Sequence, residues 1–507
     1  MKNKTLITGI VALAILGGIL TLSREKPFTP KQDVVQSPVV DLKNGDTYDL
    51  TASYVTKVVE GKWHTMLAYN GSIPGPTIRV AQGSKVTINF KNGTDMPALL
   101  HSHGVRMDNA FDGSQTVQKE MKPGESFSYK LKFPDAGVYW YHQHAKEVYG
   151  QGLGLYGAFV VSPTDSNYFP SVNREVPLFL SDLPVEGGTI TLDKNKTSHS
   201  LMGHYGTVML INGEENYMFQ AKLGEVVRLY VVNAANTRPF NFVIKGLKLK
   251  LVGADSGAYE KASFVDSVVL SPSERAITDV FMPKAGTYEI QNKTPDTMYS
   301  LGVISVSEEK IDVSHESEFN VLQSNTATTQ SIDPFRSYFN KTPDKRITLT
   351  LDMGENMMGM QGMGHGGQMM GHSHGTDGVE WEDTEKMMNQ MSNTDSIKWK
   401  IKDQDTGKEN MDIDWAFKRG EPVKIRIFND PKSLHPMQHP IHFHGQRFLV
   451  VARNGVRQTN LVWKDTTLVK SGENVDIILD PSNPGIWMSH CHISEHLEAG
   501  MMLKFIV

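Results

Sequence analysis

The chain has 507 residues, of which 51 are basic and 56 acidic, with a formal net charge of −5. This near balance excludes the basic footprint of a nucleic-acid-binding protein, and the length favours about three domains over a single hydrophobic core. One cysteine excludes an intrachain disulfide, so cysteine use does not report the redox compartment.

The first predicted element is an export signal in residues 1–30. Lys2 and Lys4 precede an apolar run from Leu6 to Leu22, which is typical of a secretory signal peptide. The run is also just long enough to remain as a membrane anchor, so cleavage and anchoring both stay open. We expect an exported protein, periplasmic or otherwise extracytoplasmic, whose only membrane contact is this segment if it is not cleaved.

The rest of the chain is predicted to be β, because short alternating apolar runs are broken by Gly, Pro, Asn and Asp. An internal repeat divides it: Gly83, Gly224 and Gly420 each precede a predicted strand that ends on an Asn nine residues later. The period is far longer than that of a solenoid repeat, so whole domains are duplicated. We predict an all-β protein of three tandem β-sandwich domains, over residues 38–163, 170–308 and 330–507.

Histidine pairs occupy equivalent places in the first and third copies, and Gln291 and Lys293 stand at one such place in the second. Packing would not select this pattern, whereas a site shared by the two outer domains would. The second domain would then act as a spacer that lets the chain ends meet. The paired positions are His101, His103, His142, His144, His442, His444, His490 and His492.

The C-terminal end indicates which metal these histidines bind. Cys491, the only cysteine, lies between two histidines and is followed by His496 and Met501. With His439 as a second imidazole, this is the ligand set of a blue-copper electron-transfer site. A buried packing cysteine is the ordinary alternative. Zinc would explain the imidazoles alone, but structural zinc sites favour several cysteines.

The eight remaining imidazoles are enough for three further copper ions. A histidine pair on a strand presents both rings on one face, and the histidines beside Cys491 point away from the face that Cys491 uses. They can therefore bind other metal ions one residue from the thiolate. Four copper ions would hold the four electrons that reduce O₂ to two waters.

These motifs resemble those of the multicopper oxidase family, most closely the three-domain bacterial laccases and copper-efflux oxidases. The ligand motifs occur in order, together with the early segment Asn70–Pro76, and the resemblance covers essentially the whole mature chain. It implies cupredoxin-like Greek-key domains. It also implies a type 1 copper on His439, Cys491, His496 and Met501, a type 2 copper on His101 and His442, and a type 3 pair on His103, His142, His144, His444, His490 and His492.

Two acidic residues join Cys491 as catalytic candidates. Asp112 matches a family acid beside the copper cluster, and we expect it to orient water or a ligand histidine. A β-turn Asp-Gly is about equally compatible with these residues. In copper-efflux oxidases an acid often directly follows the last type 1 histidine; Leu497 stands there, so Glu498 is the substitute proton donor.

Residues 353–391 form an insertion with ten Met, three His and much Gly. Gly at this density argues against a helix and favours an exposed, mobile loop. Thioethers and imidazoles suit Cu(I), and the insertion resembles the segment that covers the type 1 copper in copper-efflux oxidases. The candidate ligands for substrate copper are Met353, Met357, Met358, Met360, Met363, His365, Met369, Met370, His372 and His374.

Two residues before the third histidine motif extend this set. Met437 fits a methionine position of the family, whereas His435 stands in place of an acid and is equally compatible with an exposed loop. The isolated histidines elsewhere are interpreted as structural: His64, His199, His204 and His315.

We therefore expect a monomeric oxidase that couples oxidation of Cu(I), phenols or similar reductants to the reduction of O₂ to water, in copper tolerance. One alternative is a general laccase of phenols, amines or pigments, whose Met-rich insertion is only a lid or copper reservoir. Another is a non-catalytic cupredoxin-fold binding protein, which is disfavoured because relatives of that kind lack copper ligands.

Overall fold

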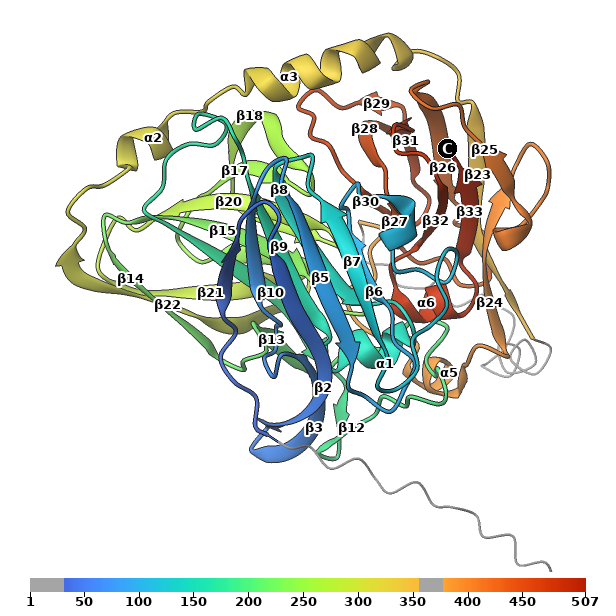
Figure 1. The fold of residues 1–507 in the computed structure, drawn as a ribbon, viewed down its shortest axis with the longest axis horizontal. Coiled ribbons are helices and arrows are strands. Elements are labelled where there is room, and N and C mark those ends of the chain that lie inside the picture. Colours follow the sequence, from blue (N-terminus) through green and yellow to red (C-terminus); the bar gives the residue numbers. More distant parts are fainter. Residues whose placement is uncertain (1–31, 355–376) are drawn as a thin grey trace, which may run out of the picture.

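The computed structural model describes residues 32–354 and 377–507 (Figure 1). The predicted N-terminal signal or anchor therefore lies outside the described residues. Most of the candidate copper ligands of the insertion lie outside them too, namely Met357, Met358, Met360, Met363, His365, Met369, Met370, His372 and His374. None of the helices within the described ranges combines the length and apolar character that a membrane span requires.

The chain folds into three β-sandwiches, which confirms the predicted all-β, cupredoxin-like class. The first sandwich packs a sheet of order β1-β4-β9-β8-β6 against one of order β3-β2-β5-β7. Its strands are β1 (Val39–Leu42), β2 (Thr47–Val59), β3 (Lys62–Tyr69), β4 (Thr77–Ala81), β5 (Lys85–Asn92), β6 (Leu100–His103), β7 (Ser126–Lys132), β8 (Gly137–Gln143) and β9 (Tyr156–Ser162), with the helices η1 (Asn109–Phe111) and α1 (Glu147–Gly152).

The second sandwich has the sheets β13-β10-β15-β20-β17-β18 and β14-β22-β21-β16-β19, with a small β11-β12 hairpin. Its strands are β10 (Arg174–Leu183), β11 (Val185–Glu186), β12 (Thr189–Ile190), β13 (Val208–Ile211), β14 (Tyr217–Leu223), β15 (Val226–Asn233), β16 (Phe240–Ile244), β17 (Leu249–Ala254), β18 (Gly257–Val265), β19 (Val268–Leu270), β20 (Arg275–Phe281), β21 (Gly286–Lys293) and β22 (Met298–Lys310). The helices α2 (Glu316–Asn320), α3 (Thr326–Ile332) and η2 (Asp333–Tyr338) lead to the third sandwich.

The third sandwich has the sheets β24-β23-β26-β31-β28-β29 and β25-β33-β32-β27-β30. Its strands are β23 (Lys345–Met353), β24 (Ile397–Asp403), β25 (Asp414–Ala416), β26 (Val423–Asn429), β27 (His439–Phe443), β28 (Arg447–Arg453), β29 (Val456–Arg457), β30 (Thr466–Val469), β31 (Asn474–Asp480), β32 (Ile486–Cys491) and β33 (Met502–Ile506). Its helices are α5 (Lys386–Met391), η3 (Asn410–Asp412) and α6 (Ser494–Glu498).

The repeated asparagines have one structural role in all three domains. Asn92, Asn233 and Asn429 end β5, β15 and β26 and are buried. Each side-chain amide donates two hydrogen bonds, to one carbonyl of the loop that follows the strand and to one near a neighbouring strand. Because a buried amide must be hydrogen-bonded, this pattern fixes the loop that leads to β6, β16 or β27.

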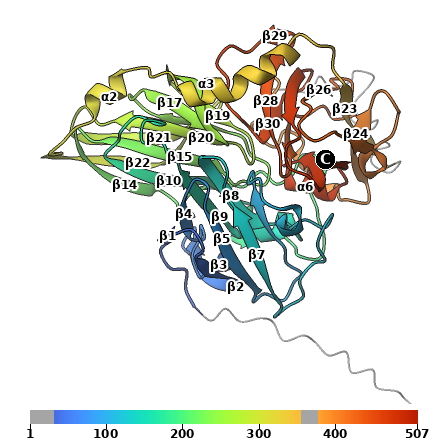
Figure 2. The same ribbon diagram turned by 45° about the horizontal axis from the view of Figure 1, so that its top comes forward.

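The three sandwiches surround one junction (Figure 2). The apolar core of the first domain continues into the second, because it includes Phe179, Tyr230 and Ile277. The core of the third domain includes Leu201 and Met202, which come from a second-domain loop. The second domain therefore packs against both of the outer domains.

The described end of the Met-rich insertion differs from the expected loop. Met353 is the last residue of β23 and is buried in the sheet core. Residues 386–391 form helix α5, and Asn389 of this helix is buried and bonds to the backbone of Met202 and Gly203. Local Gly content misled the prediction here, because the Gly residues precede position 379 and tertiary contacts stabilise the segment after it.

Candidate metal centre

The predicted histidine pairs come together where the first and third domains meet. In the first domain β6 pairs with β8, and His101 lies opposite His142. In the third domain β27 pairs with β32, and His442 lies opposite His490. Rings from the two domains stack on each other, with the centroids of His101 and His444 4.0 Å apart. Histidines more than 300 positions apart in the sequence thus form one cluster.

Most of these imidazoles have one nitrogen fixed by the protein. Backbone carbonyls lie 2.7–3.0 Å from Nδ1 of His101, His142, His442 and His490. Because a carbonyl can only accept, Nδ1 carries the proton and Nε2 keeps its lone pair. Nε2 has no hydrogen-bond partner among the described residues, although it is buried, in His101, His142, His144, His442 and His492.

The cluster therefore fits metal ions. A buried polar atom without a partner costs about 1–3 kcal/mol, and here several face one another. Burial lowers the pKa of each ring, to about 3 for His101, His444 and His490, so the imidazoles are neutral ligands at neutral pH. Imidazole nitrogens within 4.8 Å of one another form several sets of three, including His144, His444 and His490.

His103 is held differently from the other seven. Its Nε2 lies 3.0 Å from Asp465 Oδ1 and 2.9 Å from Thr466 Oγ1. Ser273 Oγ lies 3.2 Å from both ring nitrogens of His103. Ser273 belongs to the second domain.

The second domain is more than the predicted spacer. Arg275, the first residue of β20, is fully buried, and its two terminal nitrogens donate to the two oxygens of Asp465 at 2.6 Å each. Asp465 in turn contacts His103, and its carbonyl accepts from His442. The second domain therefore does more than let the chain ends meet, because one of its cations positions the carboxylate behind the cluster.

The glycine after His103 is explained by this ion pair. Gly104 has a φ of +80°, and a Cβ there would lie 2.3 Å from Asp465 Oδ2 and 2.9 Å from Arg275 Nη2. Only glycine lets the backbone pass this close in that conformation.

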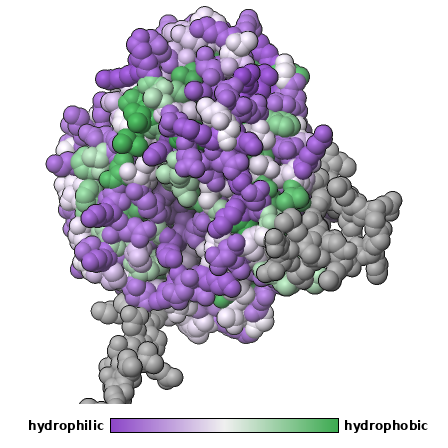
Figure 3. All heavy atoms as spheres, turned by 90° about the vertical axis from the view of Figure 1, so that its right-hand side faces the viewer, coloured by the Kyte–Doolittle hydropathy of each residue, from purple (hydrophilic) through white to green (hydrophobic). Residues whose placement is uncertain are grey.

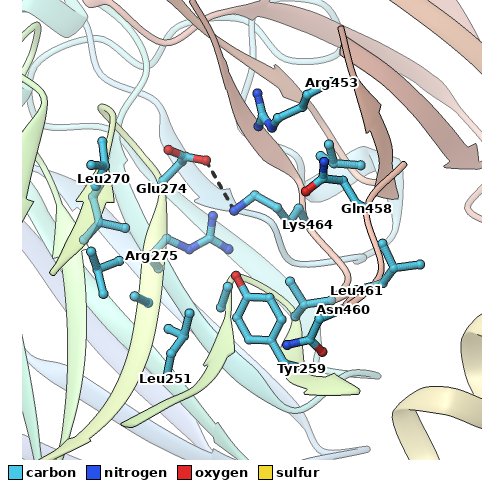
Figure 4. Close-up of a pocket in the computed structure, with 16 residues that line it drawn as sticks. Leu251, Tyr259, Leu270, Glu274, Arg275, Arg453, Gln458, Asn460, Leu461 and Lys464 are labelled. Carbon is cyan, nitrogen blue, oxygen red and sulfur yellow. Dashed lines mark ion pairs between the residues drawn. The ribbon is translucent and has the colours of Figure 1, made fainter. Parts of the chain in front are cut away.

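A cavity of about 210 Å³ lies between the second and third domains, behind Arg275 (Figure 4). Lys464 projects into it and pairs with Glu274 at 3.3 Å, and Tyr259 lines the opposite wall. Arg275, which pairs with Asp465, thus also borders a space lined by polar side chains.

The predicted type 1 ligands form a second buried cluster. Cys491 Sγ lies 3.6 Å from His439 Nδ1 and 3.8 Å from His496 Nδ1, and these nitrogens are 3.3 Å apart. Met501 is also fully buried, and its backbone bonds to Cys491 and His496. The Trp399 ring stands 4.1 Å from that of His496.

The electrostatics of this cluster favour a bound metal. Burial raises the pKa of the Cys491 thiol and lowers the pKa of His439 to about 3. A thiolate at this position therefore needs a cation to hold its charge, and a metal ion supplies one. His490 of the first cluster and Cys491 of the second are neighbours in the chain, so the two clusters are one residue apart. His490 Nδ1 also donates to the Cys491 carbonyl at 2.8 Å.

Asp112 lies where it can orient ligand histidines. Its carboxylate is 3.0 Å from His444 Nδ1, and its carbonyl accepts from His101. Burial raises the pKa of Asp112. The next residue, Gly113, has a φ of +73°, so the Asp-Gly turn and the contact with the cluster occur together.

Glu498 lies near the cluster without touching a ligand histidine. One oxygen accepts from the Val148 amide at 3.2 Å, and the other bonds the Thr197 hydroxyl. Glu147 is the acid that approaches the ligands. It lies 4.0 Å from His144 Nε2 and 3.8 Å from His492 Nδ1.

The pKa of Glu147 is raised well above its ordinary value, first by burial and then by the charge of Glu498. Sequence reasoning missed Glu147. The only signal for it is its position three residues after His144.

The candidate substrate ligands next to the third motif are not exposed. Met437 is fully buried in the third-domain core, and His435 is 2% exposed. The exposed-loop alternative for His435 is therefore wrong, since tertiary packing covers this loop. As they stand, neither Met437 nor His435 presents a ligand to solvent.

Comparison with known proteins agrees with this geometry. Multicopper oxidase family models match residues 51–166, 175–308 and 380–507. The multicopper oxidase mco of Staphylococcus aureus is 25% identical over 480 residues, which cover 92% of this chain and 90% of that protein. Copper resistance protein A of Pseudomonas syringae pv. tomato is 25% identical over 357 residues, 61% of this chain and 56% of that protein.

Among solved structures, the multicopper oxidase from Campylobacter jejuni, titled a metallo-oxidase, is 25% identical with a TM-score of 0.70. The match covers 94% of this chain and 96% of that one. Family models over all three domains, and two clusters of buried metal-binding side chains, lead to one conclusion: the chain belongs to the multicopper oxidase family of copper-dependent oxidoreductases.

Proposed function

We propose that this enzyme couples four one-electron oxidations of Cu(I), of phenols or of both to the reduction of O₂ to two waters, in copper tolerance. The observation that carries the proposal is the position of Cys491. Its sulfur faces His439 and His496, while the neighbouring His490 and His492 belong to the imidazole cluster. Copper bound at these residues would supply one-electron transfer at the thiolate and O₂ reduction at the imidazoles.

We propose the ligand partition that the family resemblance implies, with four copper ions per chain. The type 1 ion takes His439, Cys491, His496 and Met501; the type 2 ion takes His101 and His442; the type 3 pair takes His103, His142, His144, His444, His490 and His492. Copper analysis of the fully loaded enzyme tests this, and one or two ions per chain would contradict it.

The surrounding residues then have defined tasks. Asp112 orients His444 and His101 from behind. Glu147 holds a proton beside His144 and His492, because its raised pKa keeps it protonated above its ordinary titration range. Glu498 lies close enough to Glu147 for its charge to raise the pKa of Glu147, and it bonds Thr197 in the loop of the second domain. It can therefore replace the proton that Glu147 gives up.

Steady-state O₂ uptake by the holoenzyme, with Cu(I) and a phenol compared, tests the reaction. We expect uptake with Cu(I) at a stoichiometry of four Cu(I) per O₂ and no accumulated peroxide. The proposal would be refuted if O₂ were consumed neither with Cu(I) nor with the phenol, or if one peroxide were released per O₂ consumed.

A general laccase is the second candidate, favoured by the burial of Met437 and His435. Deleting residues 355–376 separates the two. This deletion spares Met353 in β23 and the packed residues 377–391. Loss of Cu(I) oxidation with phenol oxidation retained supports the cuprous oxidase, whereas no change in the ratio of the two activities supports the laccase.

We further propose an exported monomer whose only membrane contact is residues 1–30, if they are retained. Lys2, Lys4 and the apolar run that follows support export. The face shown in Figure 3 is mainly hydrophilic, with apolar side chains in small groups, so this face offers no large apolar area to a second copy. Cell fractionation and size-exclusion chromatography of the detergent-free protein test both statements.

A further inference from the structure

A loop of the second domain lies directly over helix α6, which carries His496. The Thr197 hydroxyl bonds Glu498 at the end of that helix. Three residues on, the Ser200 carbonyl accepts from the indole nitrogen of Trp399 at 2.8 Å, and Trp399 packs on His496. Anything bound by this loop is thus held beside the predicted type 1 copper.

Two histidines of this loop form a pair. The rings of His199 and His204 have centroids 4.1 Å apart. Nδ1 of His199 lies 3.0 Å from Ser198 Oγ, and Nε2 of His204 lies 3.4 Å from the same oxygen. Two imidazole nitrogens therefore lie within 3.4 Å of the same hydroxyl oxygen.

The second nitrogen of His204 is fixed from behind. Its Nδ1 lies 2.6 Å from Glu495 Oε1, and both side chains are buried. The carboxylate can only accept, so Nδ1 carries the proton and the Nε2 lone pair is turned toward His199. A histidine whose far nitrogen donates to a carboxylate is the usual arrangement of a metal ligand.

Attachment of the loop alone does not explain the pair. Glu495 also accepts from the His204 backbone amide at 3.1 Å, and this bond already holds the loop on α6. Within the described part of the chain, the ring of His199 contacts Ser198 and His204 of the same loop. Its imidazole is partly exposed and reaches the same point as that of His204.

The helix next to the pair carries thioether side chains, which are soft metal ligands. The His199 amide donates to the Ser392 carbonyl at 3.1 Å, directly after the C-terminus of α5. That helix carries Met387 and Met391, which are 68% and 51% exposed. Two imidazoles with thioethers nearby suit Cu(I), whereas zinc takes four ligands.

We propose that His199 and His204 form a binding site for substrate Cu(I) beside the predicted type 1 copper, next to the methionine-bearing helix α5. This inference rests on the proposed oxidation of Cu(I). It assigns a ligand role to histidines that the sequence presents as isolated, and it places the site on the second domain.

His199→Asn is the variant that tests the site. The backbone of His199 has a φ of +57°, a left-handed conformation that asparagine tolerates well. The substitution therefore removes the imidazole while keeping the loop and the Glu495 contacts. His315→Asn is the control, because His315 is also a partly exposed histidine but caps helix α2, far from α6, where it pairs with Glu318 at 3.5 Å.

The first measurement uses Ag(I), a redox-inert cation with the charge and softness of Cu(I), soaked into crystals of the holoenzyme. We expect an anomalous peak between His199 and His204 in the wild type and in the control, and none in His199→Asn. A wild-type crystal with no peak at the pair would overturn the site.

The second measurement compares steady-state O₂ uptake. His199→Asn is expected to raise KM for Cu(I) by roughly 10- to 100-fold, the usual loss when a residue that holds a metal site in place is substituted. Phenol oxidation and the blue absorption are expected to stay unchanged. An unchanged KM for Cu(I) overturns the inference and leaves the proposed function standing. A wild type that binds Ag(I) at the pair but oxidises only the phenol overturns the role of the pair in binding substrate, and the proposed function then stands through phenol oxidation.

Discussion

Replacing Arg275 with methionine tests whether the second domain supports the metal centre. Arg275 and Asp465 are both fully buried and joined by two hydrogen bonds of 2.6 Å. Methionine retains much of the aliphatic volume of arginine but removes its charge and donors. Asp465 is then left with Thr466 and the imidazole of His103 as its hydrogen-bond partners on the cluster side.

The expected loss is about 3–5 kcal/mol in the free energy of unfolding, the usual effect of removing one partner from a buried ion pair. Solvent does not screen this ion pair, because neither side chain is exposed. Arg426→Met is the matched control. Arg426 also pairs with an aspartate, Asp476, but is 40% exposed, so its pair is worth about 0–1 kcal/mol.

The assay is urea unfolding of the metal-free protein, followed by tryptophan fluorescence. With a slope of about 3 kcal/mol per M, Arg275→Met should lower the midpoint by roughly 1 M or more, and Arg426→Met by much less. Adding Asp465→Asn to Arg275→Met should recover part of the loss, because the stranded charge is removed. Equal shifts in the two single variants, or no recovery in the double variant, would refute the reasoning.

Three further predictions concern the two clusters. Cys491→Ser should abolish the blue absorption and turnover while the far-UV circular dichroism stays unchanged; blue colour in this variant would contradict the thiolate assignment. Gly113→Ala should destabilise the protein by about 1–3 kcal/mol or more, because a Cβ would lie 1.9 Å from the Leu100 carbonyl oxygen. Gly45→Ala is the control: a Cβ there has nothing within 4 Å, so only the smaller cost of placing alanine in a left-handed backbone conformation is expected. Equal thermal shifts in these two glycine variants would argue against the close approach. Glu147→Gln should keep the blue absorption and slow O₂ uptake; full activity would exclude Glu147 from proton delivery.

Glu147 also predicts a pH effect in the metal-free protein. Its folded pKa is raised above the ordinary value of 4.5, so between 4.5 and the raised pKa the folded state binds a proton that the unfolded state has lost. Stability therefore falls as the pH rises through this window. Glu147→Gln should flatten that fall in urea midpoints measured at a series of pH values, and parallel curves for the two proteins would contradict the raised pKa.

The sequence by itself determined the class of fold and the pattern of the ligands. Strand period and the repeated Gly and Asn positions are local properties, so they predict β5, β15 and β26 and the three sandwiches. The alternation of His490, Cys491 and His492 at the end of β32 also decides which side chains face the same way. These features depend on backbone geometry over a few residues, which a single chain segment carries.

Only the tertiary structure decided which residues contact and orient the ligand side chains. Arg275 reaches Asp465 across a domain boundary, Glu147 approaches His492 from another domain, and His199 meets His204 because the loop is fixed on α6. None of these pairs has a spacing or composition that marks it in the sequence. Their contacts depend on how the three domains and the connecting loops pack, because charged groups buried by that packing must find partners.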